Sequence, residues 1–335
     1  MKYIGMDAHS SNCVFSVMDS NGVELDNVNI ATNGKQLINY IRSVEGKKKL
    51  TFEECELSQW LYELLKEEVE ELIVCNPVAN RGYKGAKTDR IDARRLAKLL
   101  RGNFLTSVYH DGSEREKFRS LVSGYQDLVE EAVRLKNRYK SLYRKEGQKK
   151  RGSALYNDES LLDGLERSDF KFVGQKIFKL LQEMESMREE YVKEIIKAGK
   201  GFKEIRRLKT LPGIGDIQAA KIVSQVIEPS RFLNKYKYYS YCGLVRHEQR
   251  SADKQYGSKK ANGNKVLKCV YKMAAFSAIR GDNGLRKHYE HLLSSGVGEK
   301  SAYNAVCRKI AAISLSLWKH DRNYDDKLTN NDPLK

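Results

Sequence analysis

The sequence of 335 residues has no run of about 18 consecutive apolar residues, which a membrane-spanning helix would need. Its first 12 residues have neither the basic start nor the apolar stretch of a signal peptide. The 6 cysteines occur singly and form no CxxC pair, so neither a disulfide framework nor a clustered zinc site is expected. We therefore expect a cytoplasmic protein without a membrane partner, whose cysteines are reduced and mostly buried.

Acidic residues are fewer than basic ones. The chain has 44 Asp and Glu against 61 Lys and Arg, which gives a net charge of +17. Hydrophobic residues make up 40% and charged residues 31%, a composition typical of folded globular domains rather than disordered chains. An excess of positive charge spread along the whole chain favours a polyanionic partner, because binding releases the counterions condensed on phosphate backbones. A nucleic acid is the predicted partner, and a merely soluble basic protein is the alternative.

Strands and helices alternate over residues 1–108, which predicts an α/β domain with helices packed against a sheet. Apolar runs of strand length are bounded by polar turns, and the helical stretches have apolar residues at intervals of three and four. The strands are predicted at 2–7, 13–18, 24–31, 50–52 and 71–75, and the helices at 33–44 and 57–69.

Residues 109–203 have the pattern of a helical or coiled-coil arm. From Leu121 to Leu142 the apolar residues are spaced alternately four and three apart, as in a heptad repeat. A second such helix is predicted over 177–196, after a break rich in Lys and Gly at 146–152. Two helices of this kind suit either an intramolecular antiparallel hairpin or an arm through which the protein dimerises.

A compact, mainly helical domain is predicted over residues 204–325, followed by a polar tail at 326–335 that we expect to fray from about Asp321. Its apolar helical stretches lie near 218–226, 266–279 and 302–318. Residues 247–265 are polar and basic, and we expect a loop there.

Four carboxylates stand out by their position. Asp7 and Glu53 each end an apolar strand, and Asp89 and Asp92 are three residues apart on a predicted helix, hence on one face. If these four groups converge, their mutual repulsion calls for cations between them. Mg²⁺ or Mn²⁺ is expected, because both prefer carboxylate oxygens. Two such ions about 4 Å apart can activate a nucleophile and stabilise a leaving oxygen during phosphodiester cleavage.

Each acid also has an ordinary interpretation. Asp7 could belong to a turn, and the two aspartates of the helix could pair with neighbouring arginines. Glu54 and Glu56 compete with Glu53, which we prefer because it directly ends the strand. The histidines show no metal-ligand grouping, and we leave His9 out of the predicted site although it follows Asp7 by two residues.

The segments YIGMDAH, TFEEC and KTDRIDARRLA, in this order, resemble the amino-terminal RuvC-like domain of the DEDD-type insertion-sequence transposases. This family includes the Piv-type DNA invertases and the bridge-RNA-guided recombinases. The resemblance covers nearly the whole chain. It implies a ribonuclease-H-like sheet with Asp7, Glu53, Asp89 and Asp92 as metal ligands, a DNA partner, a structured guide RNA and a homo-oligomer, dimer or tetramer.

The segment LKTLPGIG, residues 208–215, resembles a helix-hairpin-helix element, which holds the DNA backbone without reading its sequence. A Gly-x-Gly turn before a helix presents unpaired N–H groups to a phosphate, so Gly213 and Gly215 are predicted to contact nucleic acid. Lys221 is added as a nearby cation. A plain tight turn between two helices is the alternative.

The resemblance also implies a catalytic serine in the basic segment after GLVR. The family's Ser-Lys pair precedes a glycine by three residues, but the corresponding position before Gly263 holds Lys260. Ser258 is the nearest serine and our candidate nucleophile, with Ser251 as the second choice. Lys259 and Lys260 are predicted to contact nucleic acid.

The sequence thus predicts an α/β domain followed by an α domain, and a transposase or site-specific recombinase of a mobile element. Two alternatives stay open. A junction-resolving endonuclease needs the same acids and no serine. A nucleic-acid-binding protein without enzymatic activity, such as a domesticated transposase, would make the acids incidental.

Overall fold

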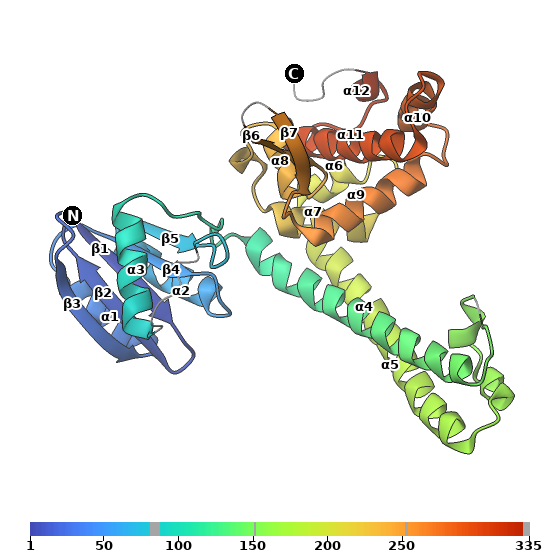
Figure 1. The fold of residues 1–335 in the computed structure, drawn as a ribbon, viewed down its shortest axis with the longest axis horizontal. Coiled ribbons are helices and arrows are strands. Elements are labelled where there is room, and N and C mark those ends of the chain that lie inside the picture. Colours follow the sequence, from blue (N-terminus) through green and yellow to red (C-terminus); the bar gives the residue numbers. More distant parts are fainter. Residues whose placement is uncertain (81–87, 151, 252–253, 331–335) are drawn as a thin grey trace. The chain divides into compact units, whose positions relative to one another are not determined.

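The computed structural model describes residues 1–80, 88–150, 152–251 and 254–330. The chain divides into two compact units, Met1–Ser113 and Glu114–Lys335 (Figure 1). No helix within the described ranges combines the length and the apolar character that crossing a membrane requires. All six cysteines are free thiols, and four of them are buried, as the sequence predicts: Cys13, Cys75, Cys242 and Cys307.

The first unit is built on a five-stranded sheet with the order β3-β2-β1-β4-β5. The first three strands are antiparallel neighbours, whereas β4 runs parallel to β1 and β5 runs parallel to β4. All five strands lie where the sequence predicts them. Their bounds are β1 (Lys2–Ala8), β2 (Asn12–Met18), β3 (Glu24–Ala31), β4 (Lys48–Glu53) and β5 (Glu71–Cys75).

One face of the sheet carries the apolar core of this unit. Alternate residues of the central strands, such as Ile4 and Phe52, are fully buried there with Leu37 of α1 (Gly34–Ser43) and Leu61 of α2 (Ser58–Leu65). A short 3₁₀ turn, η1 (Lys66–Glu68), follows α2. Because side chains alternate between the faces of a strand, the residues in between point to the other side of the sheet.

The other face is covered by α3 (Asp89–Arg101), which crosses the central strands (Figure 1). Its buried residues are all small or aliphatic: Ala93, Leu96, Ala97 and Leu100. The helix lies so close to β1 that a Cβ atom on Gly5 would meet the carbonyl oxygen of Ala93 at 2.1 Å. Glycine at this strand position therefore allows the helix to approach the sheet closely.

The second unit begins with two long helices, α4 (Glu114–Lys145) and α5 (Ser168–Gly199), which pack against each other as an antiparallel hairpin (Figure 1). The rings of Tyr139 and Phe178 lie 6.3 Å apart in a buried cluster near the end of the hairpin. Two 3₁₀ turns, η2 (Ala154–Tyr156) and η3 (Glu159–Gly164), connect the helices. Within one chain, the two helices thus form the hairpin that is one of the two predicted arrangements.

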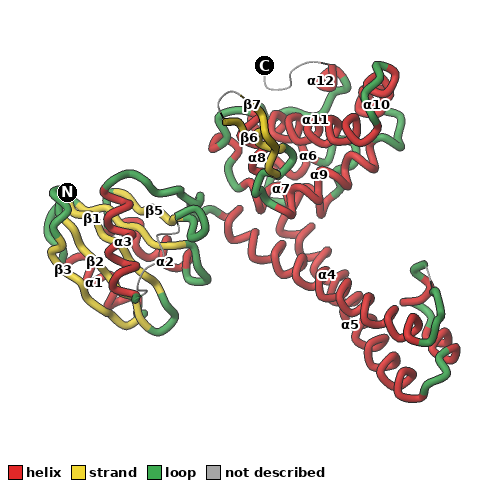
Figure 2. The backbone as a smooth tube through the Cα atoms, in the orientation of Figure 1, coloured by secondary structure: helices red, strands yellow, loops and turns green. Residues whose placement is uncertain are grey.

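The rest of this unit is mainly helical, as predicted, and α11 is its central helix, with eleven buried residues. Among the described residues the only strands of this unit form one hairpin (Figure 2). The three predicted apolar helices correspond to α7, α9 and α11. The bounds are α6 (Lys203–Leu208), α7 (Asp216–Val226), η4 (Pro229–Arg231), α8 (Lys235–Tyr241), β6 (Arg246–Ser251), β7 (Lys254–Lys260), α9 (Lys265–Ala278), α10 (Gly284–Ser294), α11 (Glu299–Lys319) and α12 (Lys327–Asn330).

Two predictions for this unit are wrong. The basic segment expected to be a loop contains the antiparallel pair β6–β7. Both faces of this hairpin are polar, so the alternation of apolar residues by which a strand is recognised is missing. The segment expected to fray is packed in place as far as the buried Thr329: Asp321 pairs with Lys203 at 3.1 Å, and Oδ1 of Asp326 accepts the N–H of Gly284 at 2.9 Å. The last five residues, 331–335, lie outside the described ranges.

Candidate metal centre

Asp7 and Glu53 occupy neighbouring positions at the carboxyl ends of two parallel strands. Met6 of β1 pairs with Phe52 of β4, so the next residue of each strand is one of the two acids. Asp7 lies two residues after Gly5 and therefore faces α3, and Glu53 shares this face. Both side chains are partly buried, with 23% and 31% exposed.

The helix α3 brings the other two acids to the same place. Asp89 is its first residue and Asp92 its fourth, and the preceding Thr88 caps the helix by accepting the N–H of Ile91 at 3.3 Å. Because Gly5 allows the helix to lie against β1, its amino terminus stands beside the carboxyl end of that strand. The positive end of the helix dipole stabilises negative charge at this position.

The electrostatics show that the four carboxylates interact. The pKa of Asp7 is raised, mainly by burial; the neighbouring His9 partly offsets this rise, and the charges of Asp89 and Asp92 add to it. The pKa of Glu53 is also raised, again mainly by burial, with the charges of Asp7 and Asp92 adding to the effect. Burial and like charge both disfavour the ionised forms, which is the condition that a bound cation relieves.

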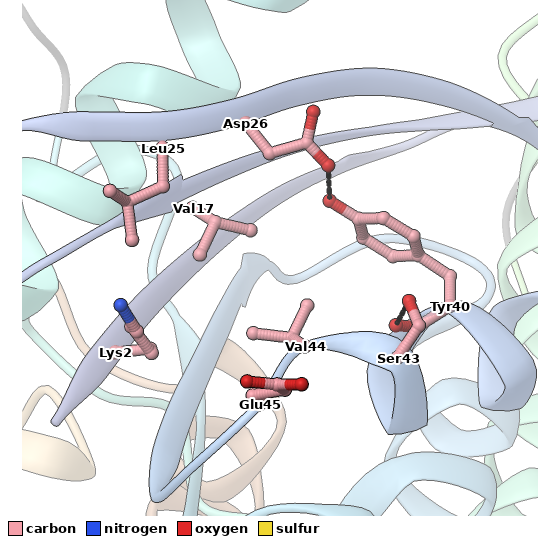
Figure 3. Close-up of a pocket in the computed structure, with 8 residues that line it drawn as sticks. All are labelled: Lys2, Val17, Leu25, Asp26, Tyr40, Ser43, Val44 and Glu45. Atoms are coloured by element: carbon pink, nitrogen blue, oxygen red, sulfur yellow. Dashed lines mark hydrogen bonds between the residues drawn. The ribbon is translucent and has the colours of Figure 1, made fainter.

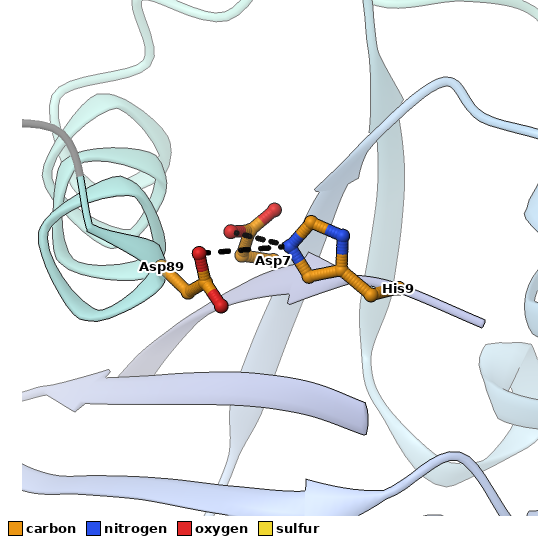
Figure 4. A group of neighbouring side chains, drawn as sticks. All are labelled: Asp7, His9 and Asp89. Carbon is orange, nitrogen blue, oxygen red and sulfur yellow. Dashed lines mark hydrogen bonds and ion pairs between the residues drawn. The ribbon is translucent and has the colours of Figure 1, made fainter. Parts of the chain in front are cut away.

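His9 is a member of this group that the sequence analysis left out. Its Nε2 atom lies 3.3 Å from Oδ2 of Asp7 and 3.8 Å from Oδ1 of Asp89 (Figure 4). One ligand atom from each of the three side chains lies within 4.8 Å of the others. The spacing of two residues from Asp7, past the end of a strand, was the signal in the sequence that could have identified it.

Arg95 is a second unpredicted member, and it lies against the other two acids. Its Nη2 donates to Oε1 of Glu53 at 2.8 Å, and its Nε lies 3.7 Å from Oδ1 of Asp92. Its Nη1 donates to the carbonyl oxygen of Asn80 at 3.0 Å. The spacing of three residues from Asp92 on one helix could have indicated this contact.

The alternatives to Glu53 are directed elsewhere. Oε2 of Glu54 lies 2.7 Å from Nε2 of His110, and the Glu54 N–H donates to the carbonyl oxygen of Cys75. Glu56 is exposed after the strand has ended. The charge of Glu53 interacts with those of Asp7 and Asp92.

The donor set fits a divalent cation. Carboxylate oxygens are the ligands that Mg²⁺ and Mn²⁺ prefer, and several half-buried carboxylates within reach of one another need a counter-charge. A pocket of about 250 Å³ lies at the opposite end of β1, beside Lys2 (Figure 3). In it, the hydroxyl of Tyr40 donates to Asp26 at 2.8 Å, and no comparable group of acids lines it.

The predicted serine lies in the second unit, on β7. Oγ of Ser258 accepts from Nε of Arg246 at 2.8 Å, and the Arg246 Nη2 donates to the Ser258 carbonyl oxygen at 2.7 Å. Ser251, the second choice, is the last residue of β6 and is exposed. Both serines therefore belong to one hairpin, and Lys259 and Lys260 are exposed beside Ser258.

The turn before α7 differs from the expected anion site. Gly213 has a φ of +85°, and a Cβ there would meet the carbonyl oxygen of Ala274 at 2.3 Å, so packing explains this glycine. The N–H of Gly215 is not unpaired as predicted, because it donates to Oε1 of Gln218 at 3.2 Å. The ammonium of Lys221 donates to Gln126 of α4 and lies over the ring of Tyr125, which directs it toward the arm.

Comparisons with known proteins give a consistent result. A family model for the DEDD transposases of IS110 elements, described as "Transposase", matches residues 4–145. A model described as "Transposase IS116/IS110/IS902 family" matches residues 205–290. A protein of Sinorhizobium fredii (strain NBRC 101917 / NGR234), named "Putative transposase y4qE", is 28% identical over 261 residues. This match covers 76% of the chain and 65% of the relative's length.

Proposed function

Because the chain belongs to the IS110 family of DEDD transposases, we propose that it cuts and rejoins DNA during transposition or recombination of a mobile element. The observation that carries this proposal is the group of Asp7, Glu53, Asp89 and Asp92 at one edge of the sheet. The family implies a ribonuclease-H-like fold, and the strand order supports a RuvC-like form of it for the first unit.

The four acids are the proposed ligands for Mg²⁺ or Mn²⁺, with His9 beside them. A divalent cation, when bound, lowers the pKa of an attacking oxygen and stabilises charge on the leaving oxygen. The chain's own contribution is to fix the acids on a rigid frame: two at strand ends, two on the first turn of a capped helix. Asp7 and Glu53 are partly buried, with 23% and 31% of their side chains exposed, and this lower local dielectric strengthens their attraction for a cation.

Ser258 is the proposed nucleophile. Its oxygen would attack a DNA phosphorus, forming a serine–phosphate ester while the bond from phosphorus to the leaving deoxyribose oxygen breaks and that oxygen takes up a proton. A DNA hydroxyl can then reverse the step, so that strands are rejoined without an external energy source. The Arg246 guanidinium, which donates to Ser258 Oγ, favours negative charge on this oxygen. Ser251 is the alternative nucleophile on the same hairpin.

DNA and a structured guide RNA are the proposed partners, and the net charge of +17 supports polyanion binding. We place the contacts at the exposed Lys259 and Lys260. A homo-oligomer formed through the arm is supported by a groove of about 540 Å³ between α4 and α5, where Val133 is 53% exposed. The proposed division of the chain is a catalytic domain at 1–108, an arm at 109–203 and a transposase domain at 204–325.

The proposal is tested with full-length protein purified with its bound nucleic acid and incubated with candidate DNA in Mg²⁺. We expect strand cleavage and a covalent protein–DNA adduct that maps by peptide sequencing to Ser258. Asp7→Asn should abolish both, and chelation of Mg²⁺ should do the same. Cleavage that Asp7→Asn leaves intact would overturn the proposed role of the acids.

Lys260 stands at the position where the family has its serine, and this departure favours a second candidate, a metal-dependent junction-resolving endonuclease that uses water. Ser258→Ala and Ser251→Ala distinguish the candidates. A recombinase loses its adduct and its joined products in one of these variants. An endonuclease retains cleavage in both variants and yields no adduct in the wild type.

A further inference from the structure

The candidate metal centre consists of two halves that differ in chemistry. In one half, Asp7 and Asp89 face the imidazole of His9, and the three ligand atoms lie within 4.8 Å of one another (Figure 4). In the other half, Glu53 and Asp92 face the guanidinium of Arg95. Among the described residues, no lysine or arginine pairs with Asp7 or Asp89, whereas Glu53 and Asp92 share the guanidinium of Arg95.

Arg95 is held in this place by more than the two acids. Its third contact, to the carbonyl oxygen of Asn80, ends on a residue that is itself fixed. Asn80 is buried, and its side chain both donates to the carbonyl oxygen of Thr106 at 3.2 Å and accepts the Thr106 N–H at 3.0 Å. The planar guanidinium thus spans a fixed backbone oxygen and a carboxylate of the site, a geometry for which arginine is suited.

A guanidinium cannot be deprotonated in a protein, so its charge persists at every pH at which the protein is folded. Its hydrogen bond occupies one lone pair of Glu53 Oε1, so a metal bound to the other lone pairs of this carboxylate would lie close to a fixed positive charge. A divalent ion between Glu53 and Asp92 would either displace Arg95 or bind close to its positive charge. Both outcomes are electrostatically unfavourable. Within the part of the chain that the structure describes, the half with His9 contains no guanidinium or ammonium group that an ion would have to displace.

From this division we propose that Arg95 takes the place of one divalent ion, so that the centre binds a single ion between Asp7, His9 and Asp89. This inference rests on the proposed function and narrows it: of the four proposed ligands, Asp7 and Asp89 bind the ion directly, whereas Glu53 and Asp92 bind Arg95. His9 contributes a nitrogen ligand, which Mg²⁺ accepts less readily than oxygen and which Mn²⁺ accepts more readily. The centre should therefore prefer Mn²⁺ to Mg²⁺.

The test counts Mn²⁺ bound to full-length, nucleic-acid-free protein by calorimetry and by electron paramagnetic resonance. The wild type should bind one tight ion with the spectrum of an uncoupled Mn²⁺. Arg95→Gln should bind a second ion and give a spin-coupled spectrum, whereas Arg95→Lys, which retains the charge, should bind one. Arg94→Gln is the matched control, because Arg94 lies on the same helix and pairs with Glu24; it should bind one ion.

A second variant tests the other half. His9→Ala should weaken Mn²⁺ binding about tenfold or more, the magnitude typical of a perturbed metal site, and should weaken Mg²⁺ binding less. Two ions of comparable affinity in the wild type, or one ion in a folded Arg95→Gln, would overturn the inference and leave the proposed function intact. Wild-type protein that binds no divalent ion would instead overturn the proposed metal chemistry. The number of Mn²⁺ ions bound by the wild type tests the inference even if Arg95→Gln does not fold.

Discussion

Gly5 lies directly beneath the backbone of Ala93, and a Cβ atom on Gly5 would come within 2.1 Å of the Ala93 carbonyl oxygen. This contact sets the distance between β1 and α3. The same approach brings Asp89 and Asp92 of the helix beside Asp7 of the strand. The candidate metal centre therefore depends on a residue that contributes no side chain to it.

Gly5→Ala should accordingly lower the free energy of unfolding of the first unit by about 1–3 kcal/mol or more, because the extra methyl group overpacks the contact between sheet and helix. Urea denaturation measures the change. Gly34→Ala is the control, since a Cβ there would meet Leu64 at an ordinary 3.4 Å. Equal stability of the Gly5→Ala and Gly34→Ala proteins would show that α3 does not rest on Gly5.

Asp7→Asn should stabilise the metal-free protein at neutral pH while it abolishes cleavage. Burial raises the pKa of Asp7 above 3.8, so the folded protein binds a proton more readily than the unfolded chain. The wild type therefore loses stability as the pH rises from 3.8 through the folded pKa, and the variant avoids this loss.

Denaturation curves at pH 3.5 and 7.5, in the presence of EDTA, should thus show an advantage of Asp7→Asn only at pH 7.5. Adding Mn²⁺ should raise the stability of the wild type and not that of the variant. A wild type that is more stable than Asp7→Asn in EDTA at pH 7.5 would contradict the expected electrostatic penalty.

Glu24→Gln should destabilise the attachment of α3 to the strands. Arg94 of the helix pairs with Glu24, and hydrogen bonds from Asn27 and Ser16 add to the effect, so that the pKa of Glu24 falls from 4.5 to about 2. This stability is present above pH 4.5 and is lost as the pH falls toward 2. We expect a loss of about 1–3 kcal/mol at pH 7 that shrinks on acidification, measured by urea denaturation across this range.

Lys259→Ala and Lys221→Met should separate DNA contact from internal packing. Lys259 is exposed, so its loss should weaken DNA binding and reduce the slope of log affinity against log salt by about 1, with unchanged stability. Burial lowers the pKa of Lys221, whose ammonium faces Gln126 and Tyr125. Lys221→Met should leave that salt slope unchanged. Fluorescence titrations at several salt concentrations measure the slope, and a reduced slope for Lys221→Met would show that Lys221 contacts a phosphate.

Val133→Glu should weaken self-association through the arm. Val133 is exposed and lines the groove between α4 and α5, where a buried charge would be costly in an interface. Light scattering should report a lower mass for this variant at equal concentration. Val23→Glu, at an exposed valine of the first unit, serves as the control and should leave the mass unchanged.

Local patterns in the sequence were sufficient to predict most of the first unit. Short apolar runs between polar turns predicted each strand. A strand that buries side chains needs apolar residues at the buried positions, and this pattern can be read directly from the sequence. Both faces of β6 and β7 are polar, so their sequences have no such pattern of apolar residues, and these two strands were not predicted. The segment after Asp321 was also not predicted to be packed, because it is held by hydrogen bonds and ion pairs between polar groups rather than by apolar residues.

The sequence by itself determined which acids end strands and which begin a helix, and its motifs and charge indicated a family that acts on DNA. Only the tertiary structure decided that His9 joins Asp7 and Asp89, and that Arg95 joins Glu53 and Asp92. The physical reason is that the alternation of apolar and polar residues is a property of the sequence itself. Contacts between distant side chains depend instead on how closely α3 can approach the sheet at Gly5. That distance exists only in the folded protein.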